Sequence, residues 1–233
     1  MALSTVVLPN LATKSAVRQQ AQFRSIVQWG IRIALLISVP AASGLYILSG
    51  PLIATIFLGG NFNINDLYMT QYSLMAYAFG LIGLSLVLIL ASAYYAKQNT
   101  KTPVKFGLIA IATNASLSIL FVTTLVFINS PYPHMGLSLA FSCSTLINAL
   151  LLFRGLYREK QIKIGRNEFG FLIRVLIASA VMAVMLIFYN PELQVWLDQS
   201  LIIRVTNLMK LIPSAIFVYF FTLFCLGIRA RDI

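Results

Sequence analysis

Long uninterrupted apolar runs dominate the chain, and short polar segments that carry most of its charges separate them. A helix needs about 20 apolar residues to cross the roughly 30 Å hydrocarbon core of a membrane. Lipid offers no partner for backbone N–H and C=O groups, and the runs lack the alternation of a membrane barrel strand, so we expect each run to be helical. The expected crossings are residues 31–57, 70–96, 104–128, 135–157, 169–190 and 204–228.

The N-terminus departs from this pattern. The stretch ALSTVVLPNLA offers about ten apolar residues, which at about 1.5 Å per residue covers half of a membrane. We expect a partial helix here, the tail of one that begins upstream, with Met1 an internal start in a longer or broken gene. Residues 14–29 are compatible with a helix at the membrane interface and equally with a polar linker. The expected fold is all-α, a polytopic transmembrane helix bundle with six full spans plus this N-terminal partial helix.

Composition agrees with a lipid environment. Hydrophobic residues make up 59% of the 233 residues and charged residues 10%, with a mean hydropathy of +0.87, whereas globular chains are about 45–50% apolar and about 25% charged. The 17 Lys and Arg outnumber the 6 Asp and Glu, which would suit nucleic acid. No basic helix or aromatic-basic stripe lies outside the apolar runs, however, so nucleic acid is not an expected partner.

The cations gather in alternate connections. If the spans alternate in direction, four regions fall on one side of the membrane and hold 15 cations, with Arg32 counted among them, against 2 on the other side. Such a bias marks the cytoplasmic face, so we expect the C-terminus to be cytoplasmic. The other cations on this side are Lys14, Arg18, Arg24, Lys97, Lys101, Lys105, Arg154, Arg158, Lys160, Lys163, Arg166, Arg174, Arg229 and Arg231.

Groups that could perform catalysis are scarce. The spans contain no Asp or Glu, the chain has one histidine, and no glycine-rich phosphate loop occurs, so no enzyme, cofactor or metal centre is expected. Cys143 and Cys225 lie in apolar runs and are interpreted as small buried hydrophobes. His134 is interpreted as a loop residue, because no Cys, Asp or Glu lies within four residues of it.

Polar residues within the spans require partners, because burying them in lipid costs energy. They lie on the third and fourth crossings. One interpretation is hydrogen bonding between small-residue helix faces, and the other is a site for an ion or a lipid headgroup. The residues considered for the ion site are Asn114, Ser118, Ser142 and Asn148.

Four cations lie near the span ends, and three of them, Arg174, Arg204 and Lys210, are candidates for binding an anionic substrate. Arg32 and Arg174 lie about one turn inside the cytoplasmic ends of their helices, where snorkelling to the interface costs little. Arg204 and Lys210 oppose the charge bias at the outer end of the last span. They are expected either to hold an anionic headgroup or to pair with the nearby acids Glu192 and Asp198.

Prolines interrupt two of the expected spans. Pro40, followed by Gly44, and Pro213 each free a backbone carbonyl and bend or break the helix that contains them. Transporters use such positions as hinges or to line a binding site, but a static kink has the same sequence pattern.

Several stretches resemble one family of membrane proteins. YYAKQNTKTPVK, residues 94–105, is similar to the cytoplasmic turn of the MurJ (MviN) lipid II flippases, in which a T-[KR]-T-P-V-[KR] run joins two helices. Similar stretches run almost from end to end of the chain. They are STVVLPNLA (4–12), WGIRIALLISVPAASGLYILSGPLIATIF (29–57), MTQYSLMAYAFGLIG (69–83) and HMGLSLAFSCSTLINALLLFRGL (134–156).

The resemblance implies a two-lobed, fourteen-helix transporter of the MOP superfamily in the bacterial inner membrane. Such a transporter carries undecaprenyl-linked lipid II, the peptidoglycan precursor, from the cytoplasmic to the outer leaflet by alternating access. This chain resembles the C-terminal lobe only, from the end of the eighth helix onward. The implied partners are lipid II or a related polyprenyl-linked precursor, the missing N-terminal lobe and membrane lipids.

Departures from the family limit which site residues can be transferred. The cavity arginines of the family belong to segments that are absent here. The last two helices, which in the family line a groove for the lipid tail, map to residues 169–190 and 204–228, with Arg174 and Arg204 at basic positions of the family. A second Asn that often follows the position of Asn114 is replaced by Ser118, which weakens any ion site at this place.

Three hypotheses follow for the function. The first is the C-terminal part of a lipid II flippase. The second is a non-transporting membrane scaffold or an inactive remnant of a truncated gene, because half of a two-lobed transporter has no complete cavity. The third is a flippase for another polyprenyl-linked saccharide, because selectivity for the headgroup would belong mostly to the missing half.

Overall fold

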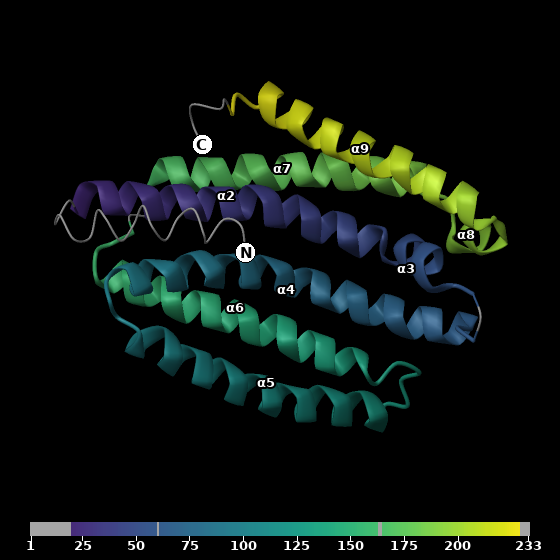
Figure 1. Cartoon of the computed structure of the whole chain (residues 1–233), viewed down its shortest axis with the longest axis horizontal. Helices are drawn as coiled ribbons and strands as arrows, with labels where there is room; N and C mark the ends of the chain where they lie inside the picture. Colours follow the sequence, from purple (N-terminus) through teal and green to yellow (C-terminus); the bar gives the residue numbers. More distant parts are fainter. Residues whose placement is uncertain (1–19, 60, 163–164, 229–233) are drawn as a thin grey trace.

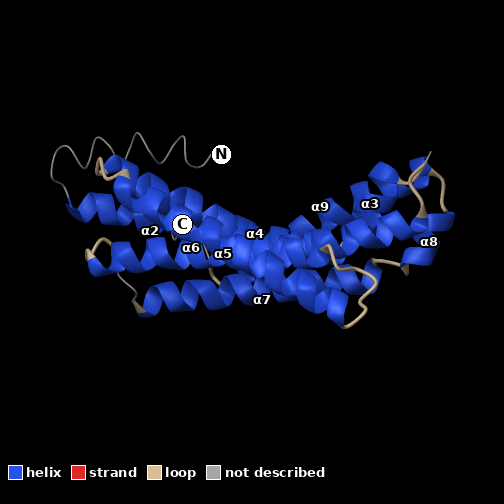
Figure 2. Cartoon of the chain, turned by 90° about the horizontal axis from the view of Figure 1, so that it is seen from below, coloured by secondary structure: helices blue, strands red, loops and turns tan. Residues whose placement is uncertain are grey.

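Helices account for every named element of the computed structural model, which describes residues 20–59, 61–162 and 165–228. The all-α prediction is therefore confirmed (Figure 2). The expected partial helix at the N-terminus lies outside the described residues. The helices are α2 (Gln20–Ile47), α3 (Ser49–Phe57), α4 (Ile64–Ala96), α5 (Lys101–Phe127), α6 (Met135–Arg158), α7 (Arg166–Tyr189), α8 (Leu193–Asp198) and α9 (Leu201–Cys225).

Six of these helices, α2, α4, α5, α6, α7 and α9, are long and apolar enough to cross a membrane. The last five coincide with the expected crossings to within two helical turns at either end. Hydropathy alone locates them because each run must fill the same membrane thickness.

The first expected crossing, residues 31–57, is two helices rather than one. In the described residues helix α2 spans Gln20–Ile47, so residues 20–29 of the polar segment are continuous with the span and are not a linker. The break falls at Leu48, between α2 and α3. Pro51 explains it, because proline has no N–H to donate to the carbonyl of Ile47 four residues earlier and its ring clashes with that carbonyl.

The two prolines that were expected to break helices do not interrupt them. Pro40 lies inside α2 and Pro213 inside α9, and both helices continue through these positions. A proline still removes one helical hydrogen bond and leaves a carbonyl to be satisfied elsewhere. For Pro40 the structure shows the new partner, which is described with the site below.

Helix α8 was not expected, because six residues in a connection carry too little pattern to predict a helix. Its Trp196 is completely buried. The indole Nε1–H donates to Oδ1 of Asn190 at 3.0 Å, which satisfies the one polar atom of the ring.

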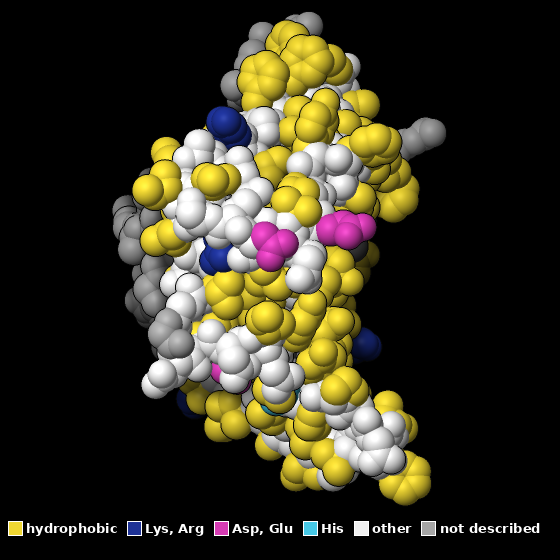
Figure 3. Space-filling view, turned by 90° about the vertical axis from the view of Figure 1, so that its right-hand side faces the viewer, with side chains coloured by type: hydrophobic (Ala, Val, Ile, Leu, Met, Phe, Trp, Pro, Cys, Tyr) yellow, Lys and Arg dark blue, Asp and Glu magenta, His cyan; other side chains and the backbone are white. Residues whose placement is uncertain are grey.

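The six long helices stand side by side in the order α9, α7, α2, α4, α6, α5, and each packs against the next (Figure 1). The short helices α3 and α8 cover the end where α9 begins. Seen end-on, the described part of the molecule has a crescent outline (Figure 3). The chain therefore forms a curved wall of helices with two broad faces.

Connections that carry most of the described cations lie at one end of this wall, which we call the basic end (Figure 1). There α2 begins, α4 turns into α5, α6 leads to α7, and α9 ends. The other end, the opposite end, carries Asp66, Glu192 and Asp198, and acidic side chains face the viewer there (Figure 3). The alternation of span directions on which the charge tally depends is thus present in the fold.

Candidate functional site

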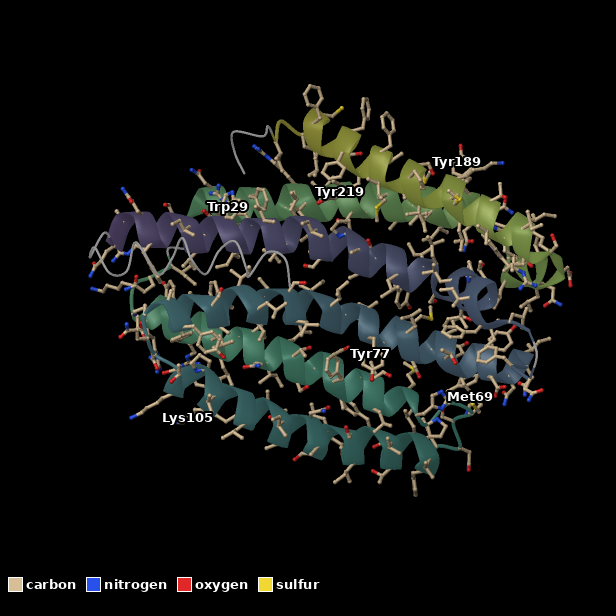
Figure 4. The ribbon with its side chains drawn as sticks, viewed as in Figure 1. Trp29, Met69, Tyr77, Lys105, Tyr189 and Tyr219 are labelled. Carbon is tan, nitrogen blue, oxygen red and sulfur yellow. The ribbon has the colours of Figure 1, made fainter. Side chains whose placement is uncertain are left out.

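An apolar groove of about 410 Å³ lies between α2, α7 and α9. It is half-open, and almost its entire lining is hydrocarbon. Six of the residues that line it are Leu36, Pro40, Gly44, Met182, Ala215 and Tyr219. Figure 4 shows Tyr219 on the side of α9 that faces α7 and α2.

Small residues on α2 and α9 leave this space open. A Cβ added to Gly44 would have Cε of Met182, at 4.0 Å, as its nearest neighbour, which is an ordinary contact distance. Across the groove, Ala215 presents only a methyl group. Larger side chains at these two positions would fill the volume that separates α2 from α9.

One polar contact crosses the wall of the groove. The hydroxyl of Tyr219 donates to the backbone carbonyl of Leu36 at 2.7 Å, and the Tyr219 side chain is buried. The Leu36 carbonyl is available because the residue four positions later is Pro40, which has no N–H. The Leu36 carbonyl that Pro40 leaves without a helical donor and the Tyr219 hydroxyl of α9 therefore satisfy each other in apolar surroundings.

Arg32 pairs with an acid. Its Nε lies 3.0 Å from Oε2 of Glu168 and its Nη2 lies 2.6 Å from Oε1, a two-point contact that joins α2 to the first turn of α7. The guanidinium carbon also lies 5.7 Å from the ring centre of Phe171, close enough for a cation–π contact. The expectation that Arg32 merely snorkels is corrected, because the fold brings a carboxylate from α7 to it.

Arg174 is placed differently. It is exposed on α7, and within the described residues it makes no ion pair or hydrogen bond with the protein. Its charge is therefore not neutralised by the described part of the protein, and its role in binding a substrate stays a prediction.

Arg204 is buried, with 7% of its surface exposed, and it holds three backbone carbonyls. Nε donates to Trp196 O at 2.7 Å, Nη1 to Ala54 O at 2.8 Å and Nη2 to Leu197 O at 2.7 Å. All three carbonyls lie near helix C-termini, where no further N–H of the helix reaches them and the helix dipole favours a cation. In the described residues Arg204 pairs with neither Glu192 nor Asp198.

Lys210 is exposed on α9. Six residues at 100° each separate it from Arg204, so the two side chains leave the helix on different faces. The fold therefore does not join Arg204 and Lys210 into one anion site.

The polar residues of α5 and α6 are also divided by the fold. The hydroxyl of Ser142 donates to Ala76 O of α4 at 2.6 Å, so the predicted hydrogen bonding between helices is confirmed for this residue. The Oδ1 atoms of Asn114 and Asn148 are buried and have no hydrogen-bond partner in the described residues. Ser118 is half-buried on α5. Ser142 is thus engaged with α4, and the two asparagines keep unsatisfied acceptors.

The sequence pattern did not single out Glu168 or Tyr219. Pro40 predicted a freed carbonyl at Leu36, but no local signal identifies the partner, because Tyr219 is 183 residues away. The acid of the Arg32 pair is 136 residues away. Such partners become visible only when the helices are packed.

Comparisons with known proteins identify the family. A family model described as "Lipid II flippase MurJ" matches residues 1–207. A "Probable lipid II flippase MurJ" of Haemophilus influenzae is 38% identical over 100% of this chain and 45% of its own length, and one of Vibrio cholerae is 34% identical over 100% of this chain and 43% of its own. The chain thus spans less than half the length of these relatives.

The fold is found in a solved structure as well. A chain titled "Lipid II flippase MurJ, inward closed conformation" superposes with a TM-score of 0.73 at 24% identity, covering 94% of this chain and 41% of that one. With six apolar helices of spanning length, the chain is a multi-pass membrane protein. By the family model and by identity to relatives over its whole length, it belongs to the lipid II flippase MurJ family.

Proposed function

We propose that this chain is the C-terminal part of a lipid II flippase and that the groove between α2, α7 and α9 holds the polyprenyl tail of the substrate. The observation that carries the proposal is the groove itself, about 410 Å³ of nearly pure hydrocarbon wall in a member of a flippase family. The proposed role is transport rather than catalysis.

The apolar lining suits a lipid tail, but it supplies little affinity by itself. A tail that enters from the bilayer exchanges one hydrocarbon environment for another, so no hydrophobic driving force acts, and close packing must supply the preference. The groove therefore selects the shape of the tail. Differences in affinity between transport states must come largely from the charged headgroup.

Charge supplies the proposed orientation. The basic end carries nearly all described cations, and such an excess marks the cytoplasmic side. We therefore place the α4–α5 turn and the C-terminus in the cytoplasm and the Asp66 connection outside the inner membrane. Labelling engineered cysteines at Lys101 and Asp66 with an impermeant reagent should modify only Asp66→Cys in intact cells. Modification of Lys101→Cys alone would show the opposite orientation, and modification of both would contradict the alternating topology.

Two exposed cations are proposed to contact phosphate groups of the substrate. Arg174 on α7 lies toward the basic end and Lys210 on α9 toward the opposite end, so one could act on each side of the membrane. Arg204 is not assigned this role, because each of its guanidinium nitrogens already donates to a carbonyl.

A cation site between α5 and α6 is the second part of the sequence-based proposal. Asn114 and Asn148 offer unsatisfied carbonyl oxygens, the ligand type that a hard cation prefers. Ser118 is retained as a candidate, whereas Ser142 is engaged with α4. Ion-dependent protection of the chain against unfolding, lost in Asn114→Ala, would test this site.

The proposed mechanism is alternating access, in which this lobe rocks against an N-terminal lobe. That lobe would correspond to the part of the relatives that this chain does not cover. Co-expression of such an N-terminal lobe in cells depleted of their own flippase should restore growth. Failure with both pieces stably expressed in the membrane would contradict the proposal and favour a scaffold or an inactive remnant. Rescue of another polyprenyl-saccharide pathway, without rescue of peptidoglycan synthesis, would favour the third hypothesis.

A further inference from the structure

Helix α9 is attached to its neighbours across the groove at two points. Near the opposite end, Arg204 bonds to Ala54 O of α3. Toward the basic end, Tyr219 bonds to Leu36 O of α2. Fifteen residues separate the two attachments, about 22 Å at 1.5 Å per residue, and the groove residues Ile212, Ala215 and Ile216 lie between them.

The two attachments differ in strength. Of the three bonds that Arg204 makes, one joins α9 to Ala54 O of α3, at 2.8 Å, and the other two hold α8 against the start of α9. The donor is charged, and charge-assisted hydrogen bonds are about twice as strong as neutral ones. Tyr219 makes one neutral bond. When α9 moves relative to α2, the Tyr219 contact is therefore the one that breaks first, and Arg204 stays as the pivot.

Pro40 keeps the Tyr219 contact specific. In a helix without proline, the carbonyl of Leu36 would accept from the N–H four residues later and would need no other partner. With Pro40 in place, both the carbonyl and the Tyr219 hydroxyl lie in apolar surroundings, where an unpaired polar group is unfavourable. The contact therefore re-forms whenever the groove narrows.

We propose that Tyr219 and Pro40 are a positioning pair that sets the width of the groove. With the Tyr219–Leu36 bond made, α9 lies close to α2; with it broken, α9 pivots about Arg204 and the groove admits a methyl-branched polyprenyl chain, which is wider than an unbranched acyl chain. The identity of this occupant rests on the proposed function. The control of groove width by Tyr219 does not depend on the proposed function.

The test measures the distances from α9 to α2 and to α3 with spin labels in lipid vesicles, after Cys143 and Cys225 are replaced by serine. One label pair, Trp29→Cys with Phe224→Cys, reports on the basic end. A second pair, Phe57→Cys with Ile202→Cys, reports on the end near Arg204. All four side chains are exposed, so the labels need not enter the core.

Tyr219→Phe removes only the hydroxyl. We expect it to shift the basic-end distances to longer and broader distributions and to leave the second pair unchanged. Pro40→Ala returns an N–H to the Leu36 carbonyl and should shift the basic-end pair in the same direction. Adding Tyr219→Phe to Pro40→Ala should then have a smaller effect than it has alone, because the two residues act through one bond.

Tyr46→Phe is the matched control. It removes a hydroxyl from an exposed α2 tyrosine whose ring packs on Phe79, and it should shift neither pair. An unchanged basic-end distribution in Tyr219→Phe, equal shifts at both ends, or strictly additive effects of the two substitutions would each overturn the proposal.

Binding of the occupant is measured separately, with a polyprenyl phosphate fluorescently labelled at its far end. The affinity in Tyr219→Phe should rise about fivefold relative to the unsubstituted chain, because the groove no longer closes through this bond, and a factor of this size is expected of one hydrogen bond. If this probe binds no variant while the distance shift occurs, the proposed function is contradicted, whereas the control of groove width by Tyr219 is supported.

Discussion

The half of the helix wall formed by α4, α5 and α6 and the half formed by α2, α7 and α9 are packed in contrasting ways. Between α4 and α6 the backbones touch: a Cβ on Gly83 would lie 2.8 Å from the backbone nitrogen of Leu146, and Ser142 donates across the same interface to Ala76 O. Between α2 and α9 the backbones are held apart, and a groove remains. Small residues therefore have opposite consequences, because in one half they permit contact and in the other they leave space.

The difference teaches which half is expected to be rigid. Close backbone contact with hydroxyl hydrogen bonds is the way in which membrane helices associate firmly without a hydrophobic driving force. Helices that are joined across a groove by a few polar contacts lose fewer packing contacts when the groove opens. We expect α4, α5 and α6 to act as the frame on which α7 and α9 move.

The largest expected effect tests the close-packed half. Gly83→Leu places a side chain against the α6 backbone, and overpacking of this kind should lower the free energy of unfolding by about 3 kcal/mol or more. Denaturation of the purified chain in detergent measures it. Gly107→Leu is the control, because nothing lies within 4 Å of a Cβ at that α5 position. Equal destabilisation by both substitutions would contradict the close-packing interpretation.

The next effect concerns the buried cation of the grooved half. Arg204→Gln leaves two or three carbonyls without donors, and we expect a loss of about 3 kcal/mol in the free energy of unfolding. Lys210→Gln, at an exposed site on the same helix, should change it by less than about 0.5 kcal/mol. A stable Arg204→Gln chain would show that the three contacts contribute little.

A substitution in the groove should raise the free energy of unfolding, whereas Gly83→Leu should lower it. Gly44→Ala adds a methyl group where the nearest atom is 4.0 Å away, and replacing a helical glycine should stabilise the chain by about 0.5–1 kcal/mol. The same unfolding measurement applies. Destabilisation by Gly44→Ala would mean that the two halves do not differ in the way described.

The smallest expected effect concerns the ion pair at the basic end. Glu168→Gln should cost about 0.5–1 kcal/mol, because both side chains keep about a quarter of their surface exposed, at 26% and 27%, and partly exposed ion pairs contribute little. The exchanged pair Arg32→Glu with Glu168→Arg should recover part of the loss. No recovery would show that the surroundings, with Phe171 beneath Arg32, require the native arrangement.

Much of the fold could be predicted because hydropathy and charge act locally. The run that gives α5 needs no knowledge of its neighbours to be recognised as a span, and the lysines of residues 97–105 indicate the basic end. The break after Ile47 was also encoded locally, by Pro51, although the bend or break was predicted at Pro40. Pro40 remains inside a continuous helix because the Tyr219 hydroxyl satisfies the carbonyl that it frees.

The site could be predicted only in part. Arg174 and Lys210 are exposed, and their role toward a ligand stays a prediction. Arg204, which has the same charge and a similar position at a span end, is buried among backbone carbonyls. A cation in a sequence carries no information about which acceptors will surround it. The polar residues of α5 and α6 were expected to bond between helices or to form an ion site, and Ser142 bonds to α4, a partner helix that the sequence did not specify.

The sequence alone determined the number of spans, the placement of the last five and the separation of the cations into alternate connections, because these depend on the transfer of each segment between water and lipid. Only the tertiary structure decided where the groove lies and which residues hold its walls. The contacts of Arg32, Arg204 and Tyr219 join residues 136, 150 and 183 positions apart. Their energies depend on the directions and distances of hydrogen bonds between packed helices, which no local pattern contains.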